Sequence, residues 1–501
     1  MICNMSRFSS PLVLLLVFVL RVSCLRTEIF SKFRELVHKE QYMRWGRGDF
    51  IKEGTIKQPL DHFHPPTQKS ITFEQRYWVN SNYWNSSDGP VFLYIGGEFE
   101  MSGEYIDLGH VLEMAKQYHG MMFGVEHRFY GKSTFEKCMD NYNITFLTSQ
   151  QALADLAQFV AFARKLYNMT DANKWIAYGG SYAGSLSAWF RLKYPKLVVG
   201  AVASSAPVEA KTDFQGYHEV VASSFASTLV GGSAKCRENL KLAFYKLDEM
   251  IKQQDFATLA LDFRFCHNIS SKNDVWLFTK KLENIFDGIV QNNDENGEYS
   301  IAEVCRNMTY TGYTPYAKLV QFVQNYLANM GFPCLNNDYT SYVTSLNNTR
   351  LDPTGESSDR QWFYQTCSQF GYFYTCEANT SCIYSTLLVD LPHYLDICFH
   401  VFGIPEKKVY QGVAFTNSDY GGKKPNGSRI VFVNGNFTPR RRVAANLLRN
   451  QRKDYDTPLT QTKFGKMTPE IIFQFLEAAP QTQIVDFSGL PKIFLPQAFI
   501  S

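Results

Sequence analysis

One serine stands at a spacing that could make it a nucleophile. Ser181 follows the apolar run Trp175–Tyr178 and two glycines, and a helical pattern, Ser185–Leu192, comes after it. This order predicts a strand, a tight turn and a helix, with the serine at the apex. In such a nucleophile elbow the Oγ points away from the sheet and can attack a carbonyl carbon, so the predicted chemistry is acyl transfer. The pattern G-x-S-x-G fits at Gly179, while Ala183 replaces its last glycine.

Acyl transfer also needs hydrogen-bond donors for the negative oxygen that forms in the transition state. The backbone N–H of Tyr182 is predicted to be one donor, because it would lie at a helix N-terminus without an intrahelical acceptor. Gly97 marks a second predicted donor turn, since paired glycines end the apolar run Pro90–Ile95 upstream of the elbow. Two plainer interpretations stay open: that Ser181 only caps a helix, and that the glycines form an ordinary β-turn.

The elements that must position these residues follow an α/β pattern. Apolar runs predict strands at 72–79, 90–95, 120–125 and 197–204. A helix is predicted from Ser149, because apolar residues recur at spacings of three and four as far as Tyr167. Strands that alternate with helices indicate a parallel sheet covered on both faces. The alternation stops near Pro207, where helical periodicity takes over.

The first 24 residues have the pattern of a secretory signal peptide. Arg7 supplies positive charge, Pro11–Leu20 forms the apolar core, and small residues lead to a predicted cut near Cys24. The apolar run is too short to span a bilayer, and no later run is longer. We therefore expect a protein of the secretory pathway without a membrane span, with a signal anchor as the alternative.

The composition fits that compartment. Nine N-x-S/T sequons stand against about four expected by chance, which predicts a glycoprotein. Nine cysteines follow the signal peptide at spacings that match no zinc or haem site, so disulfides are expected, with Cys138 as the odd thiol. The formal net charge is +3 without long basic blocks, so neither a nucleic acid partner nor a cofactor or metal is indicated. The sequons begin at Asn85, Asn143, Asn168, Asn268, Asn307, Asn347, Asn379, Asn426 and Asn436, the last with a disfavouring proline after it.

Seven longer motifs resemble one family of serine peptidases. They are Gln58–Phe63, Glu126–Gly131, Gly179–Leu186, Val202–Pro207, Arg360–Cys367, Thr416–Gly422 and Val431–Gly435. Together they make the chain similar, over roughly residues 45–436, to the secreted and lysosomal peptidases that include prolylcarboxypeptidase and dipeptidyl peptidase II. Ala183 in the elbow is typical of the thymus-specific branch, which usually has Glu where this chain has Gln369.

The resemblance implies an α/β-hydrolase core with an inserted helical cap, and a Ser-Asp-His triad in that chain order. Combined with the periodicity, it divides the chain into a first core part at 25–208, a cap at 209–350, a return to the core at 351–438 and a divergent tail at 439–501. It further implies a peptide substrate, exopeptidase action near proline or small residues, a secreted or endolysosomal location, and a homodimer.

The motif that should complete the triad is broken. In the family the return strand leads into Asn-Gly-x-x-Asp-Pro-Trp, but here the sequence is Asn434-Gly-Asn-Phe-Thr-Pro-Arg440. Thr438 takes the place of the aspartate, and no histidine follows His400, so the catalytic histidine is not found. Threonine does not hold an imidazole in its productive tautomer; in comparable triads losing the carboxylate costs roughly 10⁴-fold in rate and losing the base about 10⁶-fold.

Other residues are weak substitutes for the missing pair. His127 follows a predicted core strand, but it lies in a motif that does not supply the base in the family, so a structural role is favoured. Asp454, Asp456 and Asp486 lie downstream, yet a carboxylate without an imidazole restores little.

Two functions therefore stay open. One is a serine exopeptidase whose base and orienting carboxylate come from a different C-terminal part. The other is a catalytically inactive secreted glycoprotein that binds peptides or a partner; a lipase or esterase is a third alternative, which the motifs disfavour. The abrupt break after Gly435 favours an altered last exon or a misassigned gene model over evolved inactivity. The polar, basic start of the tail predicts that about 60 final residues pack poorly.

Overall fold

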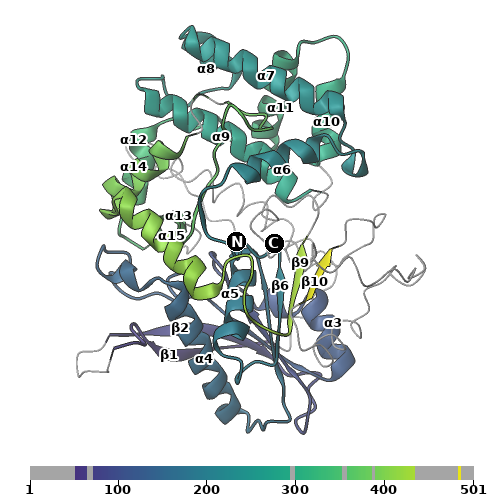
Figure 1. Cartoon of the computed structure of the whole chain (residues 1–501), viewed down its shortest axis with the longest axis vertical. Coiled ribbons are helices and arrows are strands. Elements are labelled where there is room, and N and C mark those ends of the chain that lie inside the picture. Colours follow the sequence, from purple (N-terminus) through teal and green to yellow (C-terminus); the bar gives the residue numbers. More distant parts are fainter. Residues whose placement is uncertain are drawn as a thin grey trace, which may run out of the picture.

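The computed structural model describes residues 51–64, 71–293, 299–351, 358–385, 387 and 390–434, together with the backbone of 483–486. Its strands are β1 Lys52–Pro59, β2 Thr72–Asn80, β3 Val91–Ile95, β4 Met121–Val125, β5 Trp175–Gly180, β6 Gly200–Ser204, β7 Lys211–Asp213, β8 Gly371–Phe373, β9 Ile430–Asn434 and β10 Gln483–Asp486. Eight of them form one sheet in the order β1-β2-β4-β3-β5-β6-β9-β10 (Figure 1). The pairings of β2 are antiparallel, whereas those from β4 to β10 are parallel.

Alternate residues of the strands face two different helical layers. In β3, Leu93 packs in the cluster that includes α4 (Ser149–Leu166) and α5 (Ser181–Lys193), whereas Phe92 packs against α3 (Gly109–Tyr118) on the other face. The strands are buried on both faces, as the near-continuous apolar runs predicted. The predicted α/β-hydrolase core is therefore confirmed.

A helical cap lies beyond the carboxyl ends of the parallel strands (Figure 1). Its helices fall within the predicted insertion at 209–350. They are α6 Gln215–Phe225, α7 Ala234–Lys252, α8 Phe256–Asp262, α9 Lys272–Gln291, α10 Ile301–Thr309, α11 Pro315–Asn329 and α12 Tyr339–Asn347. Shorter 3₁₀ turns are η2 Gly103–Ile106 and η3 Asn143–Phe146 in the core and η4 Thr228–Val230 in the cap.

The segment after the cap is more helical than predicted. Before the chain re-enters the sheet at β9 it forms α13 Asp359–Gln365, the π-helical turn η5 Thr366–Phe370, α14 Leu391–Phe402 and α15 Glu406–Tyr420. Strand β8 of this segment pairs in parallel with β7, which leads into the cap. The chain that enters the cap and the chain that leaves it are therefore joined by a two-stranded sheet.

The predicted disulfides are confirmed, and they staple the cap and the segment after it. Cys138 is the odd thiol, free and buried. Burial raises the pKa of this thiol to about 11, so it stays protonated. The bridges are Cys236–Cys305, Cys266–Cys334, Cys367–Cys398 and Cys376–Cys382.

Two strands of the eight-stranded sheet, β1 and β10, were not predicted from the sequence, and neither were the short β7 and β8. β1 lies near the start of the predicted first core part; half of its residues are exposed and only Ile56 and Gln58 are buried, so its sequence lacks a clear alternation of apolar and polar residues. β10 lies in the predicted divergent tail and pairs with β9 in register, from Gln483 beside Val431 to Asp486 beside Asn434. These four residues of the tail pair with the core sheet, and the other residues expected to pack poorly lie outside the described part of the chain.

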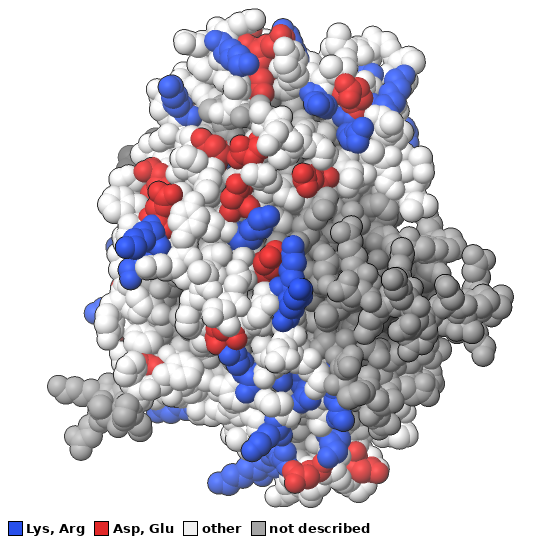
Figure 2. Space-filling model, in the orientation of Figure 1, with Lys and Arg blue, Asp and Glu red and all other residues white. Residues whose placement is uncertain are grey.

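The surface of the described residues mixes both signs of charge. Figure 2 shows Lys and Arg interspersed with Asp and Glu over the visible described face, without one extended field of a single sign. Among the described helices, none has both the length and the apolar character needed to cross a bilayer.

Candidate active site

Ser181 lies directly at the junction of β5 and α5. The strand runs to Gly180 and the helix begins at Ser181 itself, so strand and helix are both longer than predicted and no separate turn intervenes. Ser181 has φ of 58°, in the left-handed region that costs a non-glycine residue about 1–3 kcal/mol. The residue is 5% exposed. This is the strained strand-to-helix junction that a nucleophile elbow requires.

Small residues make this junction sterically possible. A Cβ at Gly179 would lie 2.1 Å from the carbonyl oxygen of Ala183, and one at Gly184 would lie 2.6 Å from the carbonyl oxygen of Ser204. Both positions therefore exclude any larger side chain. Ala183 itself is buried but accommodated, which explains why the last glycine of the common pattern is not needed here.

The two predicted oxyanion donors come together at the elbow. Tyr182 is the second residue of α5, where backbone N–H groups have no intrahelical acceptor. A Cβ built on Gly97 would lie 3.6 Å from the Cβ of Ala183, so the glycine turn after β3 packs beside the elbow. The geometry fits a donor from each side of a reacting carbonyl.

Glu126 stabilises the loop that contains this glycine turn. Its buried carboxylate accepts hydrogen bonds from the backbone N–H of Met101 at 3.0 Å and from the hydroxyl and N–H of Ser133 at 2.6 and 2.9 Å. At the start of the turn, the N–H of Gly96 donates to the carbonyl of Val125 at 2.8 Å. The motif glutamate thus fixes the loop that carries the second predicted donor.

The side chain of Tyr182 belongs to a buried hydrogen-bond chain that the sequence analysis missed. Its hydroxyl accepts a bond from Gln365 Nε2 at 2.9 Å and lies 3.1 Å from His127 Nε2. Tyr130 donates to the other end of the Gln365 amide. The signal was present in the sequence, because Tyr130 and His127 lie in one quoted motif and Gln365 in another, but spacing alone did not connect them.

His127 is placed for structure and not for proton transfer from Ser181. Its Nδ1 donates to the carbonyl of Arg128 at 2.7 Å, so its Nε2 is the acceptor for the Tyr182 hydroxyl. Burial lowers the pKa of His127 to about 4, which keeps the imidazole neutral. This supports the structural role favoured for His127.

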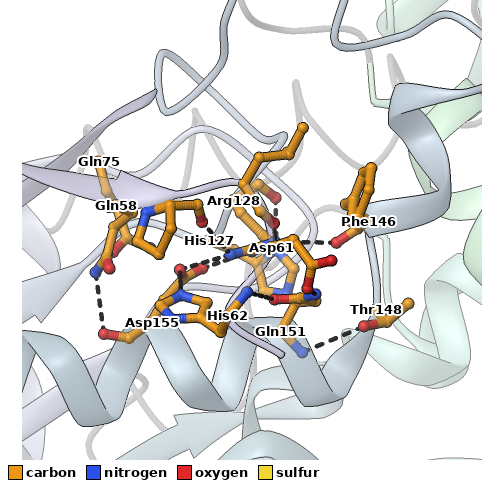
Figure 3. Close-up of polar contacts among 12 residues, drawn as sticks. Gln58, Asp61, His62, Gln75, His127, Arg128, Phe146, Thr148, Gln151 and Asp155 are labelled. Carbon is orange, nitrogen blue, oxygen red and sulfur yellow. Dashed lines mark hydrogen bonds and ion pairs between the residues drawn. The ribbon is translucent and has the colours of Figure 1, made fainter. Parts of the chain in front are cut away.

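A second buried cluster ties the first family motif to the core (Figure 3). Arg128 and Asp155 form two bonds of 2.6 and 2.7 Å, and neither side chain is exposed. His62 Nε2 lies 2.7 Å from the same carboxylate, and Gln58 Nε2 donates to the carbonyl of Asp155 at 3.0 Å. Burial alone would raise the pKa of Asp155, but the Arg128 guanidinium holds it below its usual value. This cluster fastens the end of β1 to α4.

Gln369 has a structural role at the position where the related branch has Glu. Its Oε1 accepts the N–H of Ser149, the first residue of α4, at 2.9 Å, and its Nε2 donates to Gln150 Oε1 at 2.8 Å. A glutamate in the same place could accept the first bond but could not donate the second. The neutral amide of Gln369 therefore makes both hydrogen bonds, and neither requires a charged side chain.

The elbow lies at the edge of the sheet where the parallel strands end. The register pairs Gly180 with Ser204, and Asn434 with Asp486, so β5, β6, β9 and β10 all end at this edge. Ligands of open α/β sheets bind outside the carboxyl ends of the strands. The cap lies over the edge at which β6 and β9 end (Figure 1). Ser181 follows the end of β5 at this same edge.

Several predicted residues lie outside the described part of the chain. They are the signal peptide 1–24, Asn436, Thr438, Asp454 and Asp456. Other described histidines have partners of their own: His62 with Asp155, His64 with Asp61, His218 with Asp287, His393 with Asp390, and His400 with Asp396.

The sequon asparagines differ in exposure. Asn143 is 8% exposed, and its Nδ2 donates to the Lys137 carbonyl and to Asp140 at 3.1 Å each, so the nitrogen that would carry a glycan is enclosed. Asn307 is half-buried. The remaining six are exposed: Asn85, Asn168, Asn268, Asn347, Asn379 and Asn426.

Comparison with known proteins decides the family. Residues 58–454 match the family model described as serine carboxypeptidase S28. The chain belongs to the S28 family. Human thymus-specific serine protease is 38% identical over 402 residues, 79% of this chain and 77% of that protein. The mouse thymus-specific serine protease is 37% identical, over 82% of each chain, and bovine lysosomal Pro-X carboxypeptidase is 26% identical, over 77% of this chain and 76% of that protein.

S28 membership confirms the resemblance drawn from the seven motifs, including the thymus-specific branch indicated by Ala183. It makes this chain a serine peptidase, a hydrolase, by family. The elbow of Ser181, the glycine turn and the sheet edge are the parts of the described structure that such chemistry needs.

Proposed function

We propose that this protein is a serine exopeptidase and that Ser181 is its nucleophile. The observation that carries the proposal is the left-handed Ser181 between β5 and α5, with the Gly97 turn packed beside it. Ser181 Oγ attacks the scissile carbonyl carbon, and the N–H of Tyr182 and one from the glycine turn hold the oxyanion. The proton of the Ser181 hydroxyl passes through the base to the leaving amine, and water then hydrolyses the acyl-enzyme and restores the serine hydroxyl.

Residues 401–501 contain no histidine, so the imidazole base that the family places after the return strand is absent from this sequence. Among the described histidines, His127 is excluded by its own hydrogen bonds. The orienting carboxylate has likewise no counterpart at Thr438. A form of this protein in which the return strand leads into Asp-Pro-Trp, and in which a histidine follows, would supply both the carboxylate and the imidazole.

Exopeptidase action near proline or a small residue is the specificity that we propose from S28 membership. The test is to incubate the purified protein with a pentapeptide that contains proline, free or blocked at either end, and to identify the products by mass spectrometry. Loss of one C-terminal residue would indicate a carboxypeptidase, and release of an N-terminal dipeptide a dipeptidyl peptidase. Cleavage of the doubly blocked peptide would contradict exopeptidase action.

A second candidate is a catalytically inactive glycoprotein that binds peptides or a partner. The observation that favours it is the replacement of the triad aspartate by Thr438 together with the absent late histidine. A folded chain that binds proline-containing peptides without cleaving them would support this candidate.

The remaining proposals follow from the same family. We propose a secretory-pathway protein, secreted or endolysosomal, since its disulfides need an oxidising compartment and a relative is named lysosomal. Glycans are proposed at the exposed sequons, and a homodimer is proposed by resemblance. Glycosidase treatment of the secreted chain tests the glycans, and sedimentation tests the dimer.

A further inference from the structure

Gln365 connects the segment after the cap to the residue that follows the nucleophile. It is the last residue of α13, and its amide bonds to two tyrosines that are far away in sequence. Gln365 Nε2 lies 2.9 Å from the hydroxyl of Tyr182, and its Oε1 accepts the hydroxyl of Tyr130. Gln365 and Tyr130 are fully buried and Tyr182 is 1% exposed, so water does not replace these bonds.

The direction of every bond in this chain is determined. The carbonyl of Arg128 can only accept, so His127 Nδ1 carries the hydrogen and Nε2 accepts from Tyr182. Since the Tyr182 hydroxyl donates there, it must accept from Gln365, and the Gln365 oxygen then accepts from Tyr130. The residue at position 365 must therefore donate and accept at once, as the Gln365 amide does.

We propose that Gln365 is a positioning residue of the oxyanion site, an inference that rests on the proposed function. The Tyr182 ring is fixed at its hydroxyl from two sides, by the loop after β4 and by the end of α13. The ring of Phe370, in the π-helical turn that follows Gln365, packs on it at 5.3 Å. Because this ring and the donor N–H belong to the same residue, fixing one fixes the other. The oxyanion site is thus complete only when the segment after the cap is docked on the core.

The experiment compares the rate at which a fluorophosphonate labels Ser181 in four secreted proteins. They are the wild type, Gln365→Leu, Tyr182→Phe and the double variant. We expect Gln365→Leu to lower the rate constant about tenfold, since losing an oxyanion donor outright costs about 10²–10³-fold and here it is only displaced. Tyr182→Phe removes the same bond, so the double variant should be no slower than the slower single variant.

Gln361→Leu is the matched control. Gln361 lies one turn earlier on α13 and is 7% exposed, and its amide donates to the Phe129 carbonyl at 3.2 Å instead of to Tyr182. It should lose comparable stability but keep the wild-type labelling rate. An unchanged rate in folded Gln365→Leu, or an equal loss in Gln361→Leu, would overturn the proposal.

A second readout does not depend on chemistry at Ser181. In protein labelled with ¹⁵N-tyrosine, the amide resonance of Tyr182 is identified by its loss in Tyr182→Phe. We expect it to shift in Gln365→Leu and to stay in place in Gln361→Leu. A wild type that is folded but not labelled would refute the proposed function, while an unmoved amide resonance in Gln365→Leu would refute the positioning role.

Discussion

Ser181 has a backbone conformation that a serine rarely adopts, and the residues around it are small because the strand and helix meet without an intervening turn. Gly179 faces the first turn of α5, and Gly184 faces β6. These contacts depend on the local chain, so the G-x-S pattern was sufficient to predict them. The hydrogen bonds that surround the predicted oxyanion donors, such as that between Tyr182 and Gln365, join residues that are distant in sequence. These bonds were not predicted.

Gly179→Ala should destabilise the fold by about 1–3 kcal/mol or prevent secretion, because its Cβ would lie 2.1 Å from a backbone carbonyl oxygen. The measurement is the secreted yield and the free energy of unfolding in urea. Gly97→Ala is the control for stability, since the nearest atom to its Cβ would be 3.4 Å away. Equal stability of the two variants would contradict the elbow geometry.

Asp155→Asn should destabilise the protein by about 3–5 kcal/mol, because it leaves the buried Arg128 guanidinium without its anionic partner. Thermal unfolding measures this loss. Asp171→Asn breaks an exposed ion pair with Arg164 and should leave the unfolding temperature unchanged. If both changes had the same small effect, the Arg128–Asp155 pair in the cluster of Figure 3 would not stabilise the fold as proposed.

At the scale of elements, α9 carries a buried ionisable group that responds to pH. Glu283 is fully buried, and burial raises its pKa to about 7 although Lys280 lies 3.3 Å away. Asp287 of the same helix and His218 of α6 complete the cluster. Between about pH 4.5 and 7 the folded chain keeps a proton that the unfolded chain has released, so stability falls as pH rises through this window.

Glu283→Gln should remove this dependence. The variant should match the wild type near pH 4.5 and exceed its stability above pH 7 by an amount on the order of 3 kcal/mol. Unfolding temperatures at the two pH values measure the difference, and the histidines common to both proteins cancel. Glu249→Gln, on α7, is the control, because the Glu249 side chain is 39% exposed. A variant that gains equally at both pH values would contradict the assignment.

The elements themselves were predicted where their pattern is local. The central strands and α4 have apolar residues at the expected spacing and were found within a few residues. β1 and β10 were missed because a sheet edge needs little apolar sequence, and because β10 pairs with β9 between residues 52 apart, such as Val431 and Gln483. The bond between Gln365 and Tyr182 spans 183 residues, and no single-sequence pattern reports such a contact.

At the scale of the whole molecule, the sheet continues past β9 through the pairing with β10. β9 pairs with β6 on one side and with β10 on the other. Deleting residues 483–501 should therefore leave one edge of β9 unpaired, and an unpaired strand edge favours aggregation. We expect a much lower secreted yield and a larger aggregated fraction in size-exclusion chromatography. A monodisperse, fully secreted truncation would show that the tail adds nothing to the core.

Fluorophosphonate labelling of the purified secreted chain, with Ser181→Ala as control, decides whether Ser181 is an activated nucleophile. We expect labelling of the wild type that disappears in the variant, which would mean that a base other than a histidine after His400 activates Ser181. A folded, glycosylated wild type that takes up no label would contradict it. The inactive glycoprotein would then be the better description of this chain, and the S28 activity would belong to its relatives or to a differently ended form.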